Sequence, residues 1–581
     1  MLHRRRILAS TFLFLAACTT PPSRAPEAAP VAAAPGAQVA AAPVAVAPDA
    51  SVAAAPVASV AAAPDTSVAA APVASVAAAP AARVVPAHDV RFVVLHTNDV
   101  HGQVLTRKAT WIDKQNPPQV GGLPRAAGYV NQVRDETKKA GEELLVLDAG
   151  DWYQGTPEGI VANGLEFVTA FAKLGFDAMC VGNHEFDRGV PNVLRLLTTA
   201  GVPAICANLR PKGAAERVDW VPPYRVVEKG GVRIALVGLL TQVTPEITHK
   251  DALELDFGEP RAELARVAKE LDGKVDWILP VTHLGVDKDK ELARAFPELP
   301  LIVGGHSHTL LKDGVREGDT TIVQTGTKLS CVGRVELVAH VPASDAKDRR
   351  VTFSDVHARV VDLLEEPQDA FRNHDVETRC AALAEHTKAT MEEVVGALSI
   401  GVTRSKDPLV SGPAGNLLAD VMRERAQADV GLMNRGGVRA DIDAGPVTRR
   451  EVFEIMPFDN ALVTVQMTGA QLEELVRRSV EGTAHSGIEV SGLVVRVKID
   501  AEKKRSLAGL LVGAAPLDPK HVYKVAMNSF MADGGDAYLD KGAEVARQET
   551  GVLIREVLED ALEGVKVLEP KTENRFEVVK P

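Results

Sequence analysis

The sequence predicts an α/β protein, because strand-like and helix-like segments alternate along most of its length. From residue 90 onward, short apolar runs are separated by stretches with helical patterning. Asp, Asn or His residues lie directly after, or within a few positions of, the ends of five of these runs. A second region, from about residue 396, has strands and helices of its own, and a length of 581 residues suggests two or three domains.

The apolar runs of the first region are expected to be its β-strands. They are short and separated by helical stretches, as parallel strands with crossover helices require. The runs lie at residues 90–96, 144–147, 177–181, 233–239, 277–281 and 301–303.

The second region is joined to the first by a polar segment of helical character at 366–395. Thr468 and Gln471 have the spacing of a capping box, so a helix is expected from there through residue 479. Its other expected elements are strands at 463–467 and 493–499 and a helix at 553–562.

Residues 1–17 are expected to be a signal peptide outside the fold. Three arginines at 4–6 precede a short apolar run at 7–15, and small residues precede Cys18. The pattern resembles a bacterial lipoprotein signal, which is cut before the cysteine and lipidated on its sulfur. The alternative is an ordinary signal peptide in which Cys18 occurs by chance.

Residues 18–88 are expected to be an extended tether, because Ala, Val and Pro dominate and the segment 51–64 recurs at 67–80. Frequent proline opposes long helices, and the lack of aromatic residues leaves nothing to build a core. The four cysteines beyond the tether show no CxxC spacing and are expected to be small core residues: Cys180, Cys206, Cys331 and Cys380.

The formal net charge of −12 argues against a broad surface for nucleic-acid polymers. Small anionic substrates remain compatible with this charge, because bound metal ions can invert the local field.

Side chains with metal-ligand chemistry follow five of the apolar runs. They are Asp99 and His101, then Asp151, then Asn183, then His283, and finally His306 and His308. In open α/β sheets, ligands collect at the carboxyl ends of the strands. Imidazole and carboxylate suit Zn, Mn, Co or Fe, and two ions about 3.5–4 Å apart can clamp a phosphoryl group for in-line attack. One such fragment occurs often by chance, but five in this order indicate a dimetal site.

The order Asp-x-His, Gly-Asp, Gly-Asn-His-Glu, His, Gly-His-x-His resembles the calcineurin-like metallophosphatases. Together with the second region, the GNHEFD segment resembles the 5′-nucleotidase family, which includes periplasmic UDP-sugar hydrolases. The resemblance covers about residues 89–581. It implies a four-layer α/β/β/α metallophosphatase sandwich at 89–365, a connecting segment at 366–395 and a second α/β, substrate-binding domain at 396–581.

The resemblance also implies roles at the metal centre, which would hold two divalent ions of unknown identity (Zn, Mn, Co or Fe). It assigns Asp99, His101 and His308 to the first ion. It assigns Asn183, His283 and His306 to the second ion, with Asp151 bridging the two. His184 is then the catalytic histidine that binds a phosphoryl oxygen, and Asp187 is the carboxylate that orients it. Position 308 is Gln in some relatives.

Substrate residues are expected in the second domain. Two Phe rings on loops can stack a planar base between them, although the residues alone favour core positions for these rings over such a clamp. The resemblance assigns substrate binding to Arg404, Asn434, Arg439, Phe458, Asn460, Phe530 and Asp536. A further substrate arginine is expected four residues after Arg404, but the chain has Pro408 there.

The implied activity is hydrolysis of nucleotide phosphate esters of the 5′-nucleotidase type, including UDP-sugars or nucleoside diphosphates. A metal-bound hydroxide would attack phosphorus in line. The rival predictions are a 2′,3′-cyclic-nucleotide phosphodiesterase/3′-nucleotidase, a sulfur-compound hydrolase and a non-catalytic nucleotide-binding lipoprotein. The expected location is the bacterial cell envelope, at the outer membrane, with the lipid on Cys18 as anchor and Thr19 after it. The sequence does not indicate an oligomeric state.

Overall fold

The computed structural model describes residues 86–579, apart from 110, 111, 114, 345, 347–349, 365–371 and 541–545. The expected signal peptide, most of the expected tether and Cys18 lie outside the described residues. In the part that is described, no helix is both long and apolar enough to cross a membrane.

The first sheet of the N-terminal domain has six strands in the order β16-β15-β1-β4-β5-β6. β1, β4, β5 and β6 run parallel to one another, and β15 and β16 extend the sheet antiparallel. The strands are β1 (His88–Thr97), β4 (Glu143–Asp148), β5 (Ala178–Cys180), β6 (Ala204–Ile205), β15 (Cys331–Val341) and β16 (Thr352–Asp362).

The second sheet also has six strands, in the order β13-β14-β12-β11-β9-β8. Its four central strands are parallel. The edge strands β8 and β13 each pair antiparallel with the neighbouring strand. The strands are β8 (Tyr224–Lys229), β9 (Val232–Leu240), β11 (Trp277–His283), β12 (Leu301–Val303), β13 (Val315–Glu317) and β14 (Thr320–Val323). All six predicted strands of the first region are therefore present.

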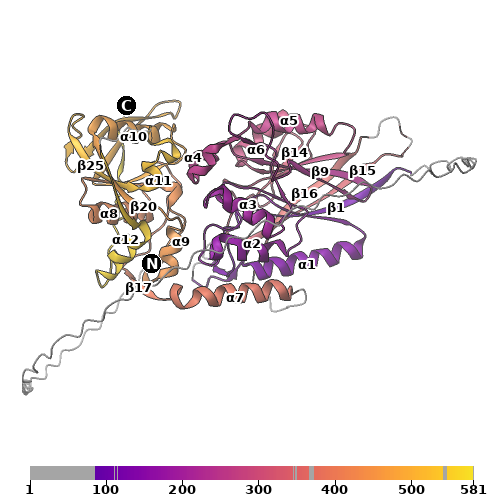
Figure 1. Cartoon of the computed structure of the whole chain (residues 1–581), viewed down its shortest axis with the longest axis horizontal. Helices are drawn as coiled ribbons and strands as arrows, with labels where there is room; N and C mark the ends of the chain where they lie inside the picture. Colours follow the sequence, from indigo (N-terminus) through magenta and orange to yellow (C-terminus); the bar gives the residue numbers. More distant parts are fainter. Residues whose placement is uncertain are drawn as a thin grey trace, which may run out of the picture. The chain divides into compact units, whose positions relative to one another are not determined.

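The two sheets pack face to face, and helices cover their outer faces (Figure 1). Alternation along β1 sends Val94 into the core between the sheets and Val93 towards the helices. The same alternation along β9 sends Leu236 inward and Val237 outward. The covering helices are α1 (Leu123–Ala140), α2 (Leu165–Ala172), α3 (Val190–Thr199), α5 (Pro260–Glu270) and α6 (Val286–Ala295). The expected four-layer α/β/β/α sandwich is confirmed.

The segment between the domains contains helix α7 (His374–Met391), which begins after the capping residue Asn373. Its buried face, with Val376 and Leu383, packs on the helical layer of the first domain. Strand β17 (Val394–Leu398) follows almost at once, so the last residues of the predicted helical segment are extended instead. The reason is pairing: β17 forms a two-stranded sheet with β19 (Gly445–Thr448).

The second domain is built on a five-stranded mixed sheet in the order β21-β18-β25-β20-β26. The expected capping box is present, because Thr468 accepts from the Gln471 backbone N–H and Gln471 accepts in return. The main strands are β18 (Val430–Asn434), β20 (Ala461–Thr468), β21 (Ile488–Ser491), β25 (Val522–Asn528) and β26 (Ala546–Leu553). The helices are α8 (Pro413–Ala426), α9 (Arg449–Ile455), α10 (Gly469–Glu481), α11 (Ser529–Ala532) and α12 (Ile554–Glu563).

A smaller sheet, in the order β24-β23-β22-β27, packs beside α10. Strand β22 (Leu493–Ile499) has the bounds predicted for it, and its Val495 and Val497 join the core that α10 covers. The other strands are β23 (Arg505–Val512), β24 (Ala515–Pro516) and β27 (Phe576–Val579).

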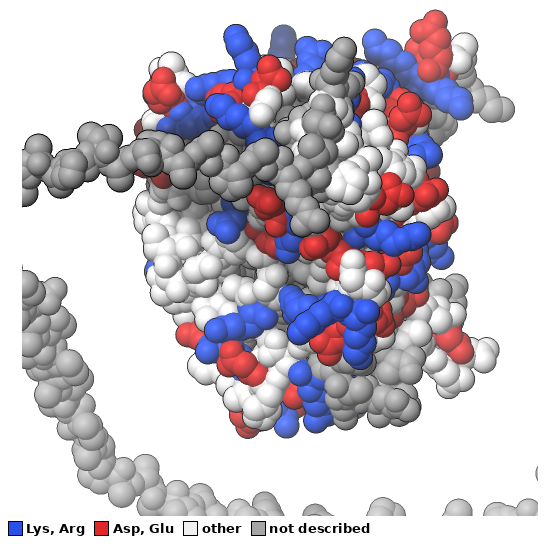
Figure 2. All heavy atoms as spheres, turned by 90° about the vertical axis from the view of Figure 1, so that its right-hand side faces the viewer, with Lys and Arg blue, Asp and Glu red and all other residues white. Residues whose placement is uncertain are grey.

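Cys180, Cys206, Cys331 and Cys380 are buried and unpaired, as predicted. On the face shown in Figure 2, acidic and basic side chains are interspersed. That face therefore lacks the single-sign surface that general binding of a phosphate backbone uses.

Candidate active site

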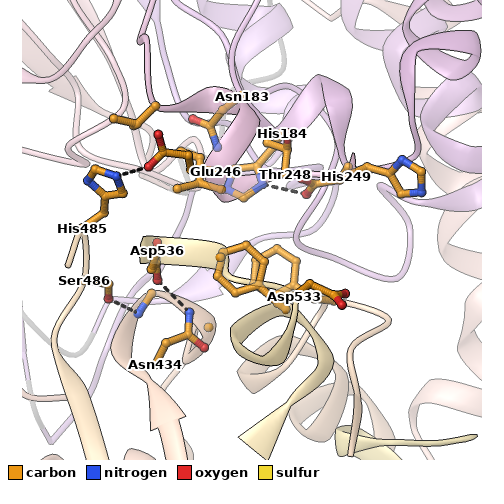
Figure 3. A pocket seen from close by; sticks show the side chains of 18 of the residues that line it. Asn183, His184, Glu246, Thr248, His249, Asn434, His485, Ser486, Asp533 and Asp536 are labelled. Atoms are coloured by element: carbon orange, nitrogen blue, oxygen red, sulfur yellow. Dashed lines mark hydrogen bonds and ion pairs between the residues drawn. The ribbon is translucent and has the colours of Figure 1, made fainter. Parts of the chain in front are cut away.

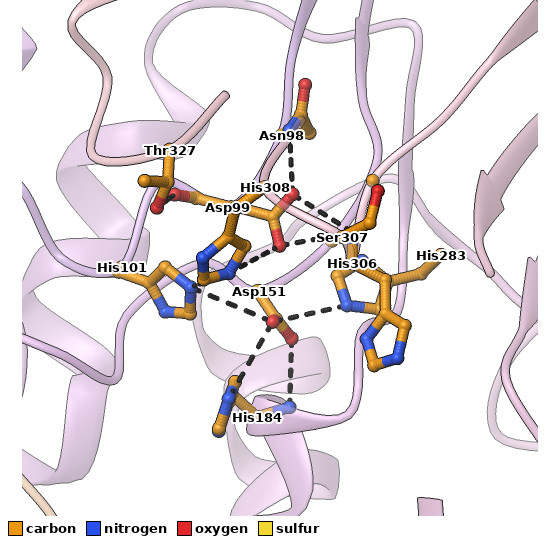
Figure 4. A network of polar contacts seen from close by, with 12 residues as sticks. Asn98, Asp99, His101, Asp151, His184, His283, His306, Ser307, His308 and Thr327 are labelled. Atoms are coloured by element: carbon orange, nitrogen blue, oxygen red, sulfur yellow. Dashed lines mark hydrogen bonds and ion pairs between the residues drawn. The ribbon is translucent and has the colours of Figure 1, made fainter. Parts of the chain in front are cut away.

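Five strands bring the candidate metal ligands to one edge of the sandwich. β1, β4 and β5 of the first sheet end there, as do β11 and β12 of the second. Parallel pairing places the carboxyl ends of neighbouring strands at the same edge, so residues far apart in sequence meet. Figure 4 shows the resulting side chains pointing towards Asp151 and Asp99.

One cluster consists of Asp99, His101, Asp151 and His308, whose potential ligand atoms all lie within 4.8 Å of one another. His308 Nε2 lies 3.2 Å from Asp99 Oδ1 and 3.0 Å from His101 Nε2. Asp99 and Asp151 are fully buried, and His308 keeps about a quarter of its side chain exposed. The cluster is thus open to solvent on the His308 side.

A second cluster shares Asp151 with the first. His283 Nε2 lies 3.2 Å from Asp151 Oδ2 and 3.1 Å from Asn183 Oδ1. His306 Nδ1 lies 2.9 Å from the same Asn183 oxygen. The seven residues predicted as ligands therefore fall into two groups that meet at one carboxylate.

The hydrogen bonds of the rings indicate that these clusters suit cations. His283 Nδ1 donates to the carbonyl oxygen of Ala149 over 2.6 Å, so a neutral ring presents the lone pair of Nε2 to Asp151 and Asn183. His101 Nδ1 likewise donates to the Gln154 carbonyl oxygen over 2.8 Å. Lone pairs converge in both groups, and a backbone carbonyl fixing the remote nitrogen is the usual support of a metal-bound histidine.

Electrostatics agree with this view. Burial lowers the pKa of His306 to about 3, and burial together with His308 and Arg439 holds the pKa of His101 well below its ordinary value. These rings are neutral and can act as ligands. Burial also opposes protonation of His283, but Asp151, Asp99 and the Ala149 carbonyl oxygen together outweigh it and raise the pKa to about 10, so this position attracts positive charge.

His184 lies beside the clusters without belonging to either. Its Nδ1 lies 2.6 Å from Asp187 Oδ2, and its Nε2 lies 3.9 Å from Asp151 Oδ2. Burial would lower the pKa of His184, but the carboxylates of Asp187 and Asp151 overcome this and raise it. An imidazolium held by one carboxylate can donate through its other nitrogen to a group at the metal edge.

The backbone around the ligands is strained and tightly packed. Left-handed φ values occur at Asp99, His101, Asp151, His306 and His308, which are five of the fourteen non-glycine residues with such values in the described part of the chain. Strain of this kind persists only where surrounding bonds hold it. The carboxylate of Glu185 supplies such bonds, because it accepts the N–H groups of residues 151, 152 and 182. At Gly182 a Cβ would lie 2.3 Å from Asp151 Oδ1, so only glycine fits.

A cavity of about 1240 Å³ extends from the metal edge across to the second domain (Figure 3). Its lining includes Asp151, Asn183 and His184 from the first domain and Arg439, Phe458 and Phe530 from the second. The volume is ample for a small-molecule ligand.

Phe458 and Arg439 bring the second domain against the metal edge. The Phe458 ring stacks on His184 with centroids 5.6 Å apart and an interplanar angle of 21°. The Arg439 guanidinium lies 5.7 Å from the same ring centroid, and its Nη2 donates to His101 Nε2 over 3.3 Å. The Phe530 ring, on the short helix α11, lies over Gly535, where a Cβ would approach it to 2.5 Å.

The remaining substrate candidates form a polar floor in the same cavity. Asn434 Nδ2 donates to Asp536 Oδ2 over 3.1 Å, and Asn528 Nδ2 donates to Asn434 Oδ1 over 2.8 Å. Burial raises the pKa of Asp536 to about 6. Asn460 also lines the cavity, while its backbone carbonyl caps α12 at Ile554.

Comparisons with known proteins agree for both domains. The calcineurin-like phosphoesterase family matches residues 92–310, and the 5′-nucleotidase C-terminal domain family matches residues 389–541. A 5′-nucleotidase of Vibrio cholerae is 29% identical over 532 residues, covering 84% of this chain and 92% of that protein. The two domains match these two families, and the chain as a whole is similar to a 5′-nucleotidase. Two solved structures add to this finding.

A crystal structure of a 5′-nucleotidase precursor from Thermus thermophilus superposes with a TM-score of 0.73 at 28% identity. It covers 84% of this chain and 99% of the other. The sulfate thiohydrolase SoxB of Thermus thermophilus has a TM-score of 0.71 at 18% identity, covering 84% and 96%, which shows a shared fold. The metal edge lies in the part of the chain that matches the calcineurin-like phosphoesterase family, and the Asp99, His101, Asp151 and His308 cluster could hold a metal ion.

One candidate of the 5′-nucleotidase resemblance is not among the cavity residues. Arg404 pairs with Asp441, donating from Nε over 3.0 Å and from its backbone N–H over 2.9 Å. Its side chain is almost half exposed. Every other predicted substrate residue lines the cavity.

Sequence reasoning missed several residues that support the site. It did not single out Glu185 as the acceptor of three backbone amides, nor Gln154, whose carbonyl oxygen orients His101. It also missed Glu246, which pairs with His485 across the cavity. For Glu185 and Gln154 a signal existed, since each stands within four residues of a predicted ligand. No sequence pattern relates Glu246 to His485.

Proposed function

We propose that this protein hydrolyses phosphate esters of nucleotides with two divalent metal ions, releasing phosphate from the 5′ position. The observation that carries the proposal is the pair of acceptor-rich clusters that share Asp151. They open into the same cavity as His184 and the two Phe rings. Phosphate chemistry and nucleoside recognition thus have adjoining sites.

The first ion would be held by Asp99, His101 and His308, and the second by Asn183, His283 and His306, with Asp151 common to both. Ions in these positions would neutralise phosphoryl charge and supply hydroxide at neutral pH. Zn, Mn, Co and Fe all suit this mixture of imidazole, carboxylate and amide.

His184 would hold a proton on Nε2 and donate it in a hydrogen bond to a phosphoryl oxygen. Asp187 accepts from Nδ1, which fixes the ring and favours its charged form. The negative charge on the transferred group grows during reaction, so a preorganised cationic donor stabilises the transition state more than the substrate.

The second domain would bind the nucleoside. Phe458 and Phe530 would stack the base, Asp536 and Asn434 would accept from and donate to its polar groups, and Arg439 would pair with phosphate. Asn460 would hold the loop of Phe458. Arg404 would contribute charge from outside the cavity, because Asp441 already holds it.

The test is phosphate release from AMP, ADP, ATP, UDP-glucose and 2′,3′-cyclic AMP by the purified full-length chain. Each substrate is assayed with Mn²⁺, Zn²⁺ or Co²⁺ and after chelation, with a coupled phosphatase for the last two substrates. Metal-dependent turnover of AMP is expected. Turnover confined to UDP-glucose or cyclic AMP would overturn the 5′ assignment, and silence with every metal would overturn the proposal.

We further propose export and lipid anchoring in the bacterial cell envelope, at the outer membrane. The support is the basic start, apolar run and small residues before Cys18. Cells fed a labelled fatty acid should label the wild-type chain but not the Cys18→Ala variant. Equal labelling of both would refute the anchor.

Domain boundaries near residues 365 and 396 belong to the same proposal. β16 ends at Asp362 and β17 begins at Val394, with α7 between them. These bounds support a connecting segment at 366–395. Limited proteolysis should cut there first, and cleavage inside either domain at the same rate would count against it.

A further inference from the structure

The loop from Asp151 to Gly155 contacts both halves of the cavity. Its first residue is the shared carboxylate of the two clusters. Three residues later, the Gln154 backbone carbonyl accepts from His101 Nδ1 over 2.8 Å. The Gln154 side chain turns the other way and donates from Nε2 to the Pro457 carbonyl oxygen over 2.8 Å. One residue thus holds a candidate metal ligand with its backbone and the second domain with its side chain.

Pro457 is next to the ring expected to stack the base. Phe458 follows it directly and packs in parallel on His184, 5.6 Å between centroids. A proline has no backbone N–H, so its carbonyl is the only hydrogen-bonding group that the backbone of this residue offers. The Gln154 amide occupies that group and so fixes the loop that carries Phe458 relative to the metal edge.

Burial makes this bond significant. Gln154 is 2% exposed and lines the cavity. Its Nε2 must be the atom facing Pro457, since a carbonyl only accepts. Its Oε1 then has no hydrogen-bond partner in the described part of the chain. A buried acceptor without a partner lowers stability, so an apolar side chain of the same length would suit folding better.

Arg439 also joins the domains at a candidate ligand, His101, but two ion pairs between the domains are of a different kind. Arg450 pairs with Glu158 over 2.7 Å, and Arg188 pairs with Asp459. These ion pairs join the domains but contact none of the candidate metal ligands. Gln154 lies between the candidate metal ligands and the loop of Phe458, and it contacts both.

We propose that Gln154 is a positioning residue that seats the base-stacking loop against the metal edge, and so makes hydrolysis depend on the nucleoside part of the substrate. This rests on the proposed function. A substrate with a base uses the seated Phe458, whereas a phosphate ester without one needs the metal edge alone. Gln154 therefore contributes to selectivity between the two kinds of ester.

The test is the variant Gln154→Met, which keeps the side-chain length and the backbone carbonyl that orients His101 but loses the donor. The measured quantity is kcat/KM for AMP divided by kcat/KM for p-nitrophenyl phosphate. We expect this ratio to fall about tenfold, with the metal content of the protein unchanged. A purely structural role would lower both rates alike and leave the ratio as it was.

The matched control is Gln103→Met. Gln103 is also buried, and its Nε2 also donates to a backbone carbonyl, that of Leu105, over 2.7 Å. Its partner lies in the same domain, so the ratio should stay within twofold of wild type. A fall as large as that of Gln154→Met would show that any lost buried amide has this effect, and would overturn the proposal.

A double-mutant cycle with Phe458→Ala tests the route of the effect. If Gln154 acts through Phe458, then adding Gln154→Met to Phe458→Ala should change the ratio by less than twofold. Two fully additive losses would overturn the proposal.

The wild-type measurement separates the proposed function from this inference. If the wild-type protein hydrolyses p-nitrophenyl phosphate but not AMP, both the proposed function and the inference are refuted. Turnover of both with an unaltered ratio in Gln154→Met refutes the inference alone.

Discussion

The metal edge of the first domain is held in place differently from the cavity-lining residues of the second domain, which we call the substrate face. At the metal edge, the candidate ligands follow five strand ends, most of them are buried, and backbone carbonyls and Glu185 support them. On the substrate face, Phe458 stands on a loop and Phe530 on the short helix α11, and both rings are only partly buried. The difference teaches that the candidate metal centre is prepared within one domain, while the proposed nucleoside site depends on how two domains meet.

The largest effect should come from breaking the shared carboxylate. Asp151→Asn removes the charge that both clusters use, so we expect phosphate release from AMP to fall by about a thousandfold or more. Metal content, measured by elemental analysis, should fall as well. Asp256→Asn is the control, because Asp256 pairs with Lys212 at the surface. Near-normal activity in Asp151→Asn would show that the two clusters are not one site.

The next effect should separate chemistry from metal binding at the same edge. His184→Ala removes a donor to the phosphoryl group but none of the ligands, so kcat should fall by about a hundredfold to a thousandfold. Metal content should stay at the wild-type value. A variant that loses its metal together with its activity would instead place His184 among the ligands.

Sequence patterns predicted which candidate ligands come together, because their placement follows from strand order. Because β1, β4 and β5 are parallel in one sheet and β11 and β12 in the other, the residues after them gather at one edge of each sheet. The alternation of Val93 and Val94 likewise predicts the two faces of β1. Local spacing also predicted the helix that begins after Thr468, since a capping box needs only four residues.

Contacts between the domains were not predictable in this way. The Gln154 side chain meets Pro457 across 303 positions of sequence, and nothing near either residue signals the other. Arg404 shows the same limit: its motif indicates a substrate arginine, but its partner is Asp441, 37 positions away. Helix α7 ends at Met391 because β17 pairs with β19, which is again a tertiary contact.

A smaller effect should appear as a pH dependence confined to nucleoside substrates. Burial raises the pKa of Asp536 to about 6 from an ordinary value near 4, so its carboxylate is ionised above pH 6 and protonated below it. The ratio of kcat/KM for AMP to that for p-nitrophenyl phosphate should fall severalfold between pH 7 and pH 5. The ratio cancels changes at the metal edge, which affect both substrates. Asp536→Asn should flatten this dependence, and an unchanged slope in that variant would exclude Asp536 as its source.

The smallest effect is expected at Arg404. Because its guanidinium is half exposed and already paired with Asp441, removing it should change kcat/KM for AMP by less than threefold. Arg439→Ala is the matched comparison: this guanidinium lines the cavity and reaches His101, so its loss should cost tenfold or more. Parallel assays of both variants with AMP and ADP would decide the matter. If Arg404→Ala matched Arg439→Ala, the arginine would have to leave Asp441 during turnover, and the substrate face would be more mobile than its contacts with the metal edge imply.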